Sequence, residues 1–582
     1  MDSVLKGLED CHQMLRDHIC RNARQNKDYQ STLTHSALPR KRACSHPSAN
    51  QVFSGTTEDG ETSESVPLAG LVPLPVLVSV IDTYFQHCHN QPYSFFHEQT
   101  FRDRFEQNQI PDYLLFAVLA IATRFSTHSF FEGKAQEAAL TFANNSWKSV
   151  MAICLAGVSI ADLMTVQTMI LLSIVDFNAG HSRQGAAWVK IGLAVRIAQE
   201  LRLMIDDRVD LSPVDQEERR RVFWSLYLVD RIVSCGRGRP PAILEASCQL
   251  QLPCDERSWR DGIPRETDTL DRLSTKSLAR DKLGPFAMVI ITAYIMSRAA
   301  QHMLQLYNIR SQDPPWDPNS EFASISSDLL YVESQFQLGT TIADLLVDDP
   351  HAIEDHLSAP LIVFSRALFY LSHCLLNHPF LLRHRLETTK TRGPSSFLER
   401  AFQSSRVCAK HLTNHLREAV DAGCPMNSAF YGYCAVVAGS IQALHLHSEE
   451  ELLREEALQC VQSNIALVEQ LGMFWDNVAV MADALKAFSA DTLRFHVLTL
   501  PNPTSPPLGP SDREVLWSLV DYSTMSGVPK TAQPYHPDST AVVDASLQPW
   551  LDLFGPQGLE LVQGADRLHM EIAGDTAAFG SL

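Results

Sequence analysis

The feature that most restricts the fold of this chain is a series of apolar segments with helical spacing, from residue 71 to about residue 490. In Gly185–Leu203, for example, Trp188, Ile191 and Val195 recur at the spacing of a helix turn and share one face. Alternating apolar and polar runs long enough for strands are absent. We therefore predict one large all-α domain over residues 71–490, folded as a multi-helix array.

Helix-breaking residues lie between the apolar segments rather than within them. Proline and glycine are concentrated in Asp313–Asn319, Lys390–Ser396 and Pro501–Pro510. Further loops are predicted at Ser258–Asp281 and Arg310–Ala323. The apolar segments therefore correspond to separate helices joined by loops.

The segment Gly185–Leu203 also indicates how closely the helices are expected to pack. Ala187, Ala194 and Ile197 widen its apolar face beyond a single stripe, so we expect this helix to be buried on most sides. We expect Gly192, which has no side chain, to allow close approach of a neighbouring backbone.

Composition restricts the possible partners and the cellular compartment. The formal net charge of -19 means that a DNA phosphate backbone repels the chain as a whole, so DNA contact would need a local basic patch. The thirteen cysteines include no CxxC pair, which fits reduced thiols in a cytosolic or nuclear protein. The apolar runs Ala422–Ser448 and Leu283–Ser297 are interrupted or too short for a membrane span, so we predict buried helices and no membrane partner.

The two ends of the chain differ from its middle. Residues 1–70 are polar and irregular, and we predict a largely disordered region with a short helix and a basic cluster at Arg40, Lys41 and Arg42. That cluster is a candidate nuclear import signal or a generic exposed basic turn.

Residues 491–582 are predicted to form a flexible acidic and apolar tail. It contains a candidate activation segment, whose alternative is a disordered tail with one docking helix. The residues of this segment are Trp550, Leu551, Asp552, Leu553 and Phe554.

The segment Glu217–Ile243, EERRRVFWSLYLVDRIVSCGRGRPPAI, has the most specific pattern in the chain. Acidic residues at its start favour a helix N-terminus, and Phe223 and Trp224 supply apolar packing. Gly238 and Pro240 then end the helix. We predict a well-packed helix followed by a sharp turn.

Charged residues within this segment receive separate predictions. Asp230 and Arg231 lie in an apolar run, where burial requires partners, so we expect a structural clamp with partners on another helix. The run Arg219–Arg221 stands beside three acidic residues, which leave little net field. We therefore expect those arginines at a solvated surface, paired with a neighbouring helix.

Four segments, in this order, resemble the regulatory middle homology domain of fungus-specific transcription factors: Gln91–Phe101, Gly185–Leu203, Glu217–Ile243 and Leu368–Leu382. The resemblance implies a nuclear transcriptional regulator of a metabolic or secondary-metabolite gene set. It also implies transcriptional protein partners, homodimerisation and a small effector. The structural signature residues implied by it are Trp188, Arg220, Arg221, Phe223, Trp224, Asp230, Arg231, Gly238, Arg239 and Pro240.

The resemblance further implies a zinc-cysteine module that reads DNA, in which six thiolates hold two zinc ions. Pro39–Cys44 is similar to the lead-in of such a module, but the following residues, Ser45 to Ser48, contain no second cysteine. Cys11, His18 and Cys20 resemble the end of another zinc finger, without its upstream CxxC. We predict no zinc site and no cofactor in this chain. Either the protein acts without touching DNA itself, or the gene sequence has lost an exon after Cys44.

The strongest rival is a DDxxD motif at Asp206, Asp207 and Asp210, which is typical of all-helical enzymes that bind magnesium diphosphate. Such a site needs a second acidic motif opposite the first, and none is present. Hydrolase and zinc-protease motifs are also absent. We predict a non-enzyme, with a magnesium-dependent enzyme and a ligand-sensing or scaffold module as the alternatives.

Overall fold

The computed structural model describes residues 72–156, 161–206, 210–305, 313–339, 342, 357–500 and 508–525. Within these ranges the regular structure is helical, and the only strand-like feature is an isolated bridge between Gln251 and Thr269. The predicted all-α array is therefore confirmed. The basic cluster at residues 40–42 and the activation segment at residues 550–554 lie outside the described residues, as do residues 1–70 and 526–582 of the two ends that we predicted to be disordered.

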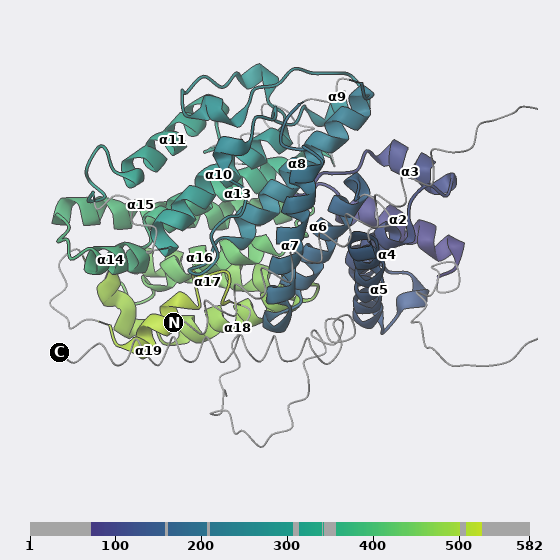
Figure 1. Cartoon of the computed structure of the whole chain (residues 1–582). Helices are drawn as coiled ribbons and strands as arrows, with labels where there is room; N and C mark the ends of the chain where they lie inside the picture. The colour runs from purple at the N-terminus through teal and green to yellow at the C-terminus, as the bar shows by residue number, and fades with distance from the viewer. Residues whose placement is uncertain are drawn as a thin grey trace, which may run out of the picture. The chain divides into compact units, whose positions relative to one another are not determined.

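The helices follow one another with short connections, several of which contain a 3₁₀ turn. They appear in Figure 1 in chain order from purple to yellow. Their bounds are α2 (Leu74–His87), α3 (Glu98–Glu106), α4 (Asp112–Ala122), α5 (Ala135–Ala156), α6 (Leu163–Asn178), α7 (His181–Glu200), α8 (Pro213–Val233), α9 (Glu256–Arg260), α10 (Pro285–Leu304), α11 (Glu321–Phe336), α13 (Ala359–Leu376), α14 (Pro379–Thr388), α15 (Ser395–Asp421), α16 (Phe430–Ala443), α17 (Glu451–Gly472), α18 (Asp476–Ala490) and α19 (Pro510–Trp517).

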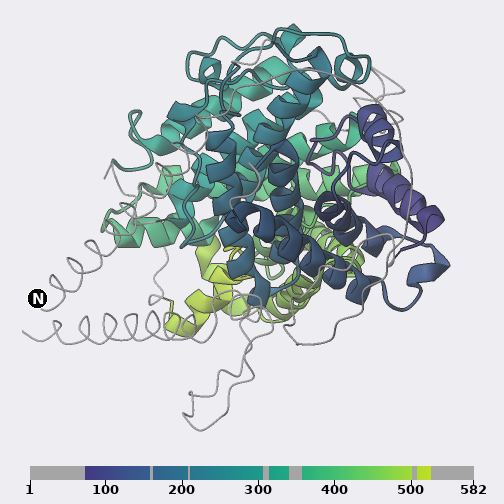
Figure 2. The same ribbon diagram turned by 45° about the vertical axis from the view of Figure 1, so that its right-hand side comes forward.

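All described residues belong to one compact unit, and its helices pack in two sets. Helices α4, α5, α6 and α7 pack in sequence order, and α13 packs against α10, α15 and α16. Helix α8 contacts α6 and α7 from the first set and α10 from the second. The two views in Figures 1 and 2 show α8 between these sets, so its residues are placed to link them.

Local sequence signals fix where several helices begin. The side chain of Ser212 accepts a hydrogen bond from the Asp215 backbone N–H, and Pro213 occupies the first turn of α8. Asp162 and Thr165 form a reciprocal capping box at the start of α6. The predicted start of the helix in the 217–243 segment is thus confirmed.

Helix α7 confirms one expectation and corrects another. It is buried on most sides, as its wide apolar face predicts, and only one narrow stripe is exposed. Gly192 lies on that stripe, and a Cβ atom added there would have no neighbour within 4 Å. The prediction that Gly192 allows close backbone approach is therefore wrong.

Close helix packing instead depends on two glycines of α16. A Cβ atom at Gly432 would lie 2.8 Å from Val478 Cγ1, and one at Gly439 would lie 2.8 Å from Leu485 Cδ2. Both contacts are with α18. The absence of side chains on this face of α16 lets the two helices approach closely.

Among the described residues, one helix is long and apolar enough to cross a membrane, namely α13. About 89% of it is buried inside the array, where it packs against α10, α15 and α16. Its apolar composition is accounted for by its place in the core.

The packed chain continues beyond residue 490, where we predicted the tail to begin. Phe495 and Leu498 are buried in a 3₁₀ helix, and α19 brings Leu516 and Trp517 into the core. We placed this docking segment in the tail because the proline-rich stretch Pro501–Pro510 interrupts it, although apolar residues lie on both sides of that stretch.

We expect the two kinds of glycine to respond oppositely to alanine. Gly432→Ala overpacks the α16–α18 contact and should lower the free energy of unfolding by about 1–3 kcal/mol. Gly192→Ala meets no neighbour and should raise it by about 0.5–1 kcal/mol, since alanine is the better helix former. Chemical denaturation followed by circular dichroism measures both. Equal effects would contradict the assigned packing.

Buried neutral histidines make the array sensitive to acid. Burial lowers the pKa of His378 to about 3, compared with 6.5 for an exposed histidine. Between these values the unfolded chain binds one more proton, so stability falls by about 1.4 kcal/mol per pH unit as the pH decreases. His378→Gln should therefore reduce the slope of unfolding free energy against pH below 6.5. The exposed His447→Gln is the control and should leave the slope unchanged.

Candidate functional site

The first half of α8 is built around the fully buried guanidinium of Arg221. Its Nε donates to Glu217 at 2.9 Å, and Nη1 donates to both Glu256 and Ser94 at 2.8 Å. Nη2 donates to the Cys254 carbonyl at 2.7 Å. Two carboxylates from different elements therefore compensate one buried cation, as burial of a charge requires.

Aromatic rings enclose the same guanidinium. Its carbon lies 4.0 Å from the ring centre of Trp259 and 5.6 Å from that of Phe286. Such stacking adds a cation–π interaction to the ion pairs. Arg221 thereby joins α8 to α9, α10 and the loop that contains Ser94.

Two neighbouring positions extend this network across the surface of α8. Arg220 donates to Glu217 at 2.6 Å and to Asp206 at 3.0 Å. Glu218, also buried, accepts from Gln167 at 3.1 Å and pairs with Arg104 at 3.2 Å. The expectation that Arg219–Arg221 forms a solvated surface is therefore wrong for Arg220 and Arg221, because the adjacent acids are buried with them.

Burial raises the pKa of both outer carboxyl groups of the network. For Glu256 the opposing contribution comes from Arg221, and for Glu218 from Arg104. Both acids are therefore easier to protonate in the folded protein than in the unfolded chain. The arginines are what make their burial as anions acceptable.

The second half of α8 holds the segment that follows it, residues 234–243, which we call the exit loop. Asp230 accepts hydrogen bonds from the backbone N–H groups of Ala242 and Ile243, at 2.9 and 3.0 Å. Arg231 donates to the Ile243 carbonyl and pairs with Glu245 at 3.2 Å. Asp230 and Arg231 hold the exit loop in place. The predicted partner on another helix is wrong for Asp230, which binds the loop backbone, whereas Glu245, the partner of Arg231, begins the 3₁₀ helix Glu245–Ser247.

Further residues of the exit loop contact helices on either side. The Arg239 guanidinium lies 5.7 Å from the Trp188 ring centre and donates to Gln184 of α7 at 3.5 Å. The Gln305 side chain, at the end of α10, donates to the carbonyls of Ser234, Gly236 and Arg239. Pro240 and the exposed Gly238 complete the turn. No local sequence pattern indicates this role of Gln305.

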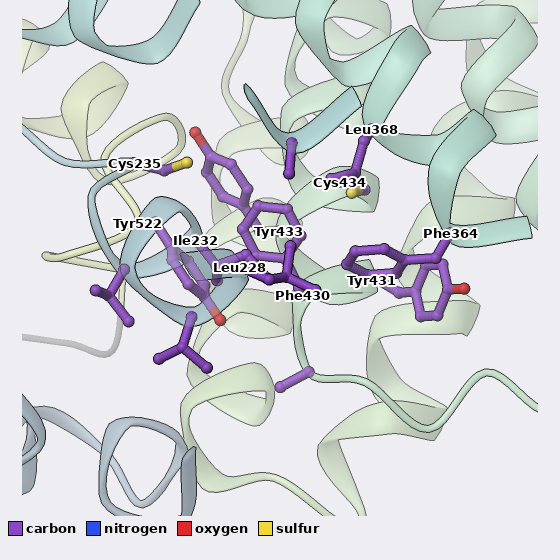
Figure 3. Close-up of a cluster of buried hydrophobic side chains, with 14 of the residues drawn as sticks. Leu228, Ile232, Cys235, Phe364, Leu368, Phe430, Tyr431, Tyr433, Cys434 and Tyr522 are labelled. Carbon is purple, nitrogen blue, oxygen red and sulfur yellow. The ribbon is translucent and has the colours of Figure 1, made fainter. Parts of the chain in front are cut away.

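The four resembling segments converge on α8. Ser94, in the first, bonds Arg221, and Trp188, in the second, contacts Arg239 of the third. Figure 3 shows Leu368, from the fourth, in one buried cluster with Leu228 of α8. Phe223 and Trp224 of α8 are also fully buried, and the Trp224 indole donates to the Gln251 carbonyl at 2.7 Å. The signature residues thus form the joint between the two helix sets.

Comparison with known proteins shows which families and proteins this chain resembles. The sequence model of the fungal specific transcription factor domain matches residues 81–329, which run from α2 to α11. Residues 81–329 of this chain are therefore similar to a fungal specific transcription factor domain. Helix α8, its buried charges and the exit loop lie within the matched residues, whereas Leu368 lies beyond them.

Curated relatives agree with this assignment. The Zn(2)-C6 fungal-type transcription factor FTF1c of Fusarium oxysporum f. sp. lycopersici is 24% identical over 417 residues, which cover 68% of this chain and 43% of the relative. FTF2 of the same fungus is 24% identical over 419 residues, 68% of this chain and 38% of the relative. An uncharacterized transcriptional regulatory protein of Schizosaccharomyces pombe is 29% identical over 51% of this chain and 31% of its own length. The chain spans about two fifths of the first relative.

The rival DDxxD motif lies at the edge of the joint around α8. Asp206 is committed to Arg220 and to the Gln251 backbone N–H, which donates to it at 3.0 Å. Asp210 is also engaged in an interaction, and Asp207 lies outside the described residues. Among the described residues no three metal-ligating side chains gather, so the observed contacts of Asp206 do not support a magnesium site.

The described cysteines do not fit zinc either. They are dispersed over helices and loops, and burial raises the pKa of Cys248 to about 11 and that of Cys254 to about 12, so these thiols are neutral. Zinc is bound by thiolates held close together. The cysteines predicted as remnants of a zinc module, Cys11, Cys20 and Cys44, lie outside the described residues.

Two cavities lie beside the joint around α8. The inner one, lined by Tyr84, Asn178 and Tyr522, measures about 40 Å³, which suits a few water molecules. The outer one is a cleft of about 400 Å³ between Leu203, at the end of α7, and Arg219 of α8. Ligand pockets for small molecules are typically about 300–1,000 Å³. Only the outer cleft therefore has the size of a small-molecule site among these two.

We expect Arg221 to be the most sensitive position of the network. Arg221→Ala leaves Glu256 buried without its cation and leaves Glu217 with Arg220 alone, which should cost about 3–5 kcal/mol of unfolding free energy at pH 7. The loss should shrink toward pH 5, because protonation neutralises the stranded carboxyl groups. Denaturation at both pH values tests this. The control is Arg260→Ala, which removes an exposed ion pair with Asp261 and should cost less than about 1 kcal/mol of unfolding free energy. Similar losses at Arg221 and Arg260 would contradict the assigned role of Arg221.

Proposed function

We propose that this protein is a nuclear transcriptional regulator whose helical array works as a scaffold for protein partners. The observation that carries the proposal is the domain match over residues 81–329, together with relatives that are named as transcription factors. Those comparisons support a transcriptional regulator. The nucleus as its location, transcriptional proteins as partners and a metabolic or secondary-metabolite gene set as its target are our extension.

Internal charge pairing favours protein partners over direct DNA contact by the array. Arg220, Arg221 and Arg231 each pair with carboxylates of the same chain, so they are not available to phosphate groups. The formal net charge of -19 opposes approach to DNA as well. We propose that DNA is reached indirectly, or through an N-terminal module that is degenerate or lost around Cys44.

Two features are proposed for regulation. The cleft of about 400 Å³ beside Asp206 and Arg219 is the candidate site for a small effector, because its size fits and it borders the joint. Homodimerisation stays a proposal from the resemblance. We further propose that Arg40, Lys41 and Arg42 direct import of the protein into the nucleus. The segment at residues 550–554 would then activate transcription.

The output segment is testable with a reporter. The chain is fused to a heterologous DNA-binding domain, and truncation after Met525 removes the tail while keeping every described residue. We expect reporter output to fall to the level of the DNA-binding domain alone. Alanine at Trp550, Leu551, Leu553 and Phe554 should have the same effect, since these side chains would dock in a partner groove.

A control in the same tail separates composition from sequence. Alanine at Leu559 and Leu561 removes apolar side chains outside the segment and should leave output unchanged. Equal output from the full chain and the truncated chain, at matched protein levels, would contradict the activation role and favour the scaffold alternative.

A further inference from the structure

Residues 508–525, which we call the clasp, contact the exit loop as well as the preceding 3₁₀ helix, where Arg494 pairs with Asp512 at 3.0 Å. The Tyr522 backbone N–H donates to the Cys235 carbonyl at 2.9 Å. Arg237 Nε donates to Asp521, a buried carboxylate, at 2.9 Å. Arg237 also pairs with Glu514 at 3.7 Å, so the clasp binds the exit loop through one backbone bond and two ion pairs.

Apolar contacts hold the clasp from the other side. The Tyr522 ring lies 4.9 Å from that of Tyr433 and 5.2 Å from that of Phe430, and Figure 3 shows all three rings in the buried cluster. Trp517 lies between the Arg237 guanidinium, 4.5 Å away, and the Phe380 ring, 5.0 Å away. The clasp is thus bound in the way that a peptide ligand would be. The residues that bind are an acidic residue of the clasp, Asp521, and the aromatic residue that follows it, Tyr522.

The exit loop is shaped to accept the clasp at Gly236. A Cβ atom there would lie 2.5 Å from Ser523 Oγ, 2.7 Å from Ser523 Cβ and 2.8 Å from Asp521 Oδ1. Gly236 has no positive φ, so its backbone conformation is open to other residues. The glycine is therefore required by the contact with the clasp and not by the turn. Gly238, two residues away, has no neighbour within 4 Å of such an atom.

We infer that the clasp is a releasable intramolecular ligand of the exit loop, and that its docking restrains the transcriptional tail that begins after Met525. Release of the clasp frees the root of that tail and raises transcriptional output. A partner that displaces the clasp would present the same chemistry, an acidic residue followed by an aromatic one. The regulatory half of this inference rests on the proposed function, whereas the docking half does not.

The test compares Gly236→Ala with Gly238→Ala in the full chain. Hydrogen–deuterium exchange of the amides in residues 516–525 should be about tenfold faster or more in Gly236→Ala, with α8 and α10 still protected. Gly238→Ala should match the unmodified protein. The double variant Gly236→Ala/Ser523→Gly removes two of the three close atoms and should regain much of the protection.

Each outcome decides one part of the inference. Equal exchange in the two alanine variants would overturn docking at Gly236. Loss of protection throughout α8 in Gly236→Ala would show that the clasp is an inseparable part of the array and overturn its release. In the DNA-tethered reporter, Gly236→Ala should raise output, and unchanged or lower output with a released clasp would overturn the regulatory half. If truncation after Met525 alone leaves output unchanged, the proposed activation role fails instead, and the exchange result stands.

Discussion

The buried cation of Arg221 is the interaction on which the rest of the domain depends. A guanidinium without solvent contact is tolerable only when carboxylates and carbonyls surround it, and here they come from α8 itself, α9 and two loops. Those segments must be in place together, because each one supplies a partner that the others cannot replace. The network therefore specifies one arrangement of elements around α8, in addition to whatever stability it contributes.

The second half of α8 uses the same principle on the backbone. Asp230 satisfies the N–H groups of Ala242 and Ile243, while Gln305 satisfies three carbonyls of the exit loop. A loop with two adjacent prolines offers few backbone donors of its own. In a helix these backbone groups would bond to one another, whereas here they bond to side chains at α8 and at the end of α10. The loop is therefore ordered without belonging to any helix.

Much of the fold could be predicted from the sequence, since helical spacing and helix breakers are local properties. The α8 helix begins after Ser212 and ends before Gly238, as its residues indicate. The partners of buried charges could not be predicted, because Ser94 and Glu256 lie far from Arg221 in the chain and have ordinary local contexts. The same limit explains the wrong expectations for Gly192 and for Arg220, where composition alone does not say which face meets a neighbour. The clasp was missed because it follows a proline-rich stretch, although it contains several apolar residues, among them Leu516, Trp517 and Tyr522.

The position of the clasp in the chain has a consequence for how the protein is made. Residues 508–525 leave the ribosome after every other described segment, and translation at roughly 5–20 residues per second separates them from α8 by tens of seconds at the slower rate. During that interval the carbonyl of Cys235 has no clasp to cover it, and the rings of Phe430 and Tyr433 lack one from their own synthesis until residue 522 is made. A nascent chain of this protein therefore exposes apolar surface until its synthesis is nearly finished. Chaperones that bind exposed apolar surface would be expected to bind it during that time.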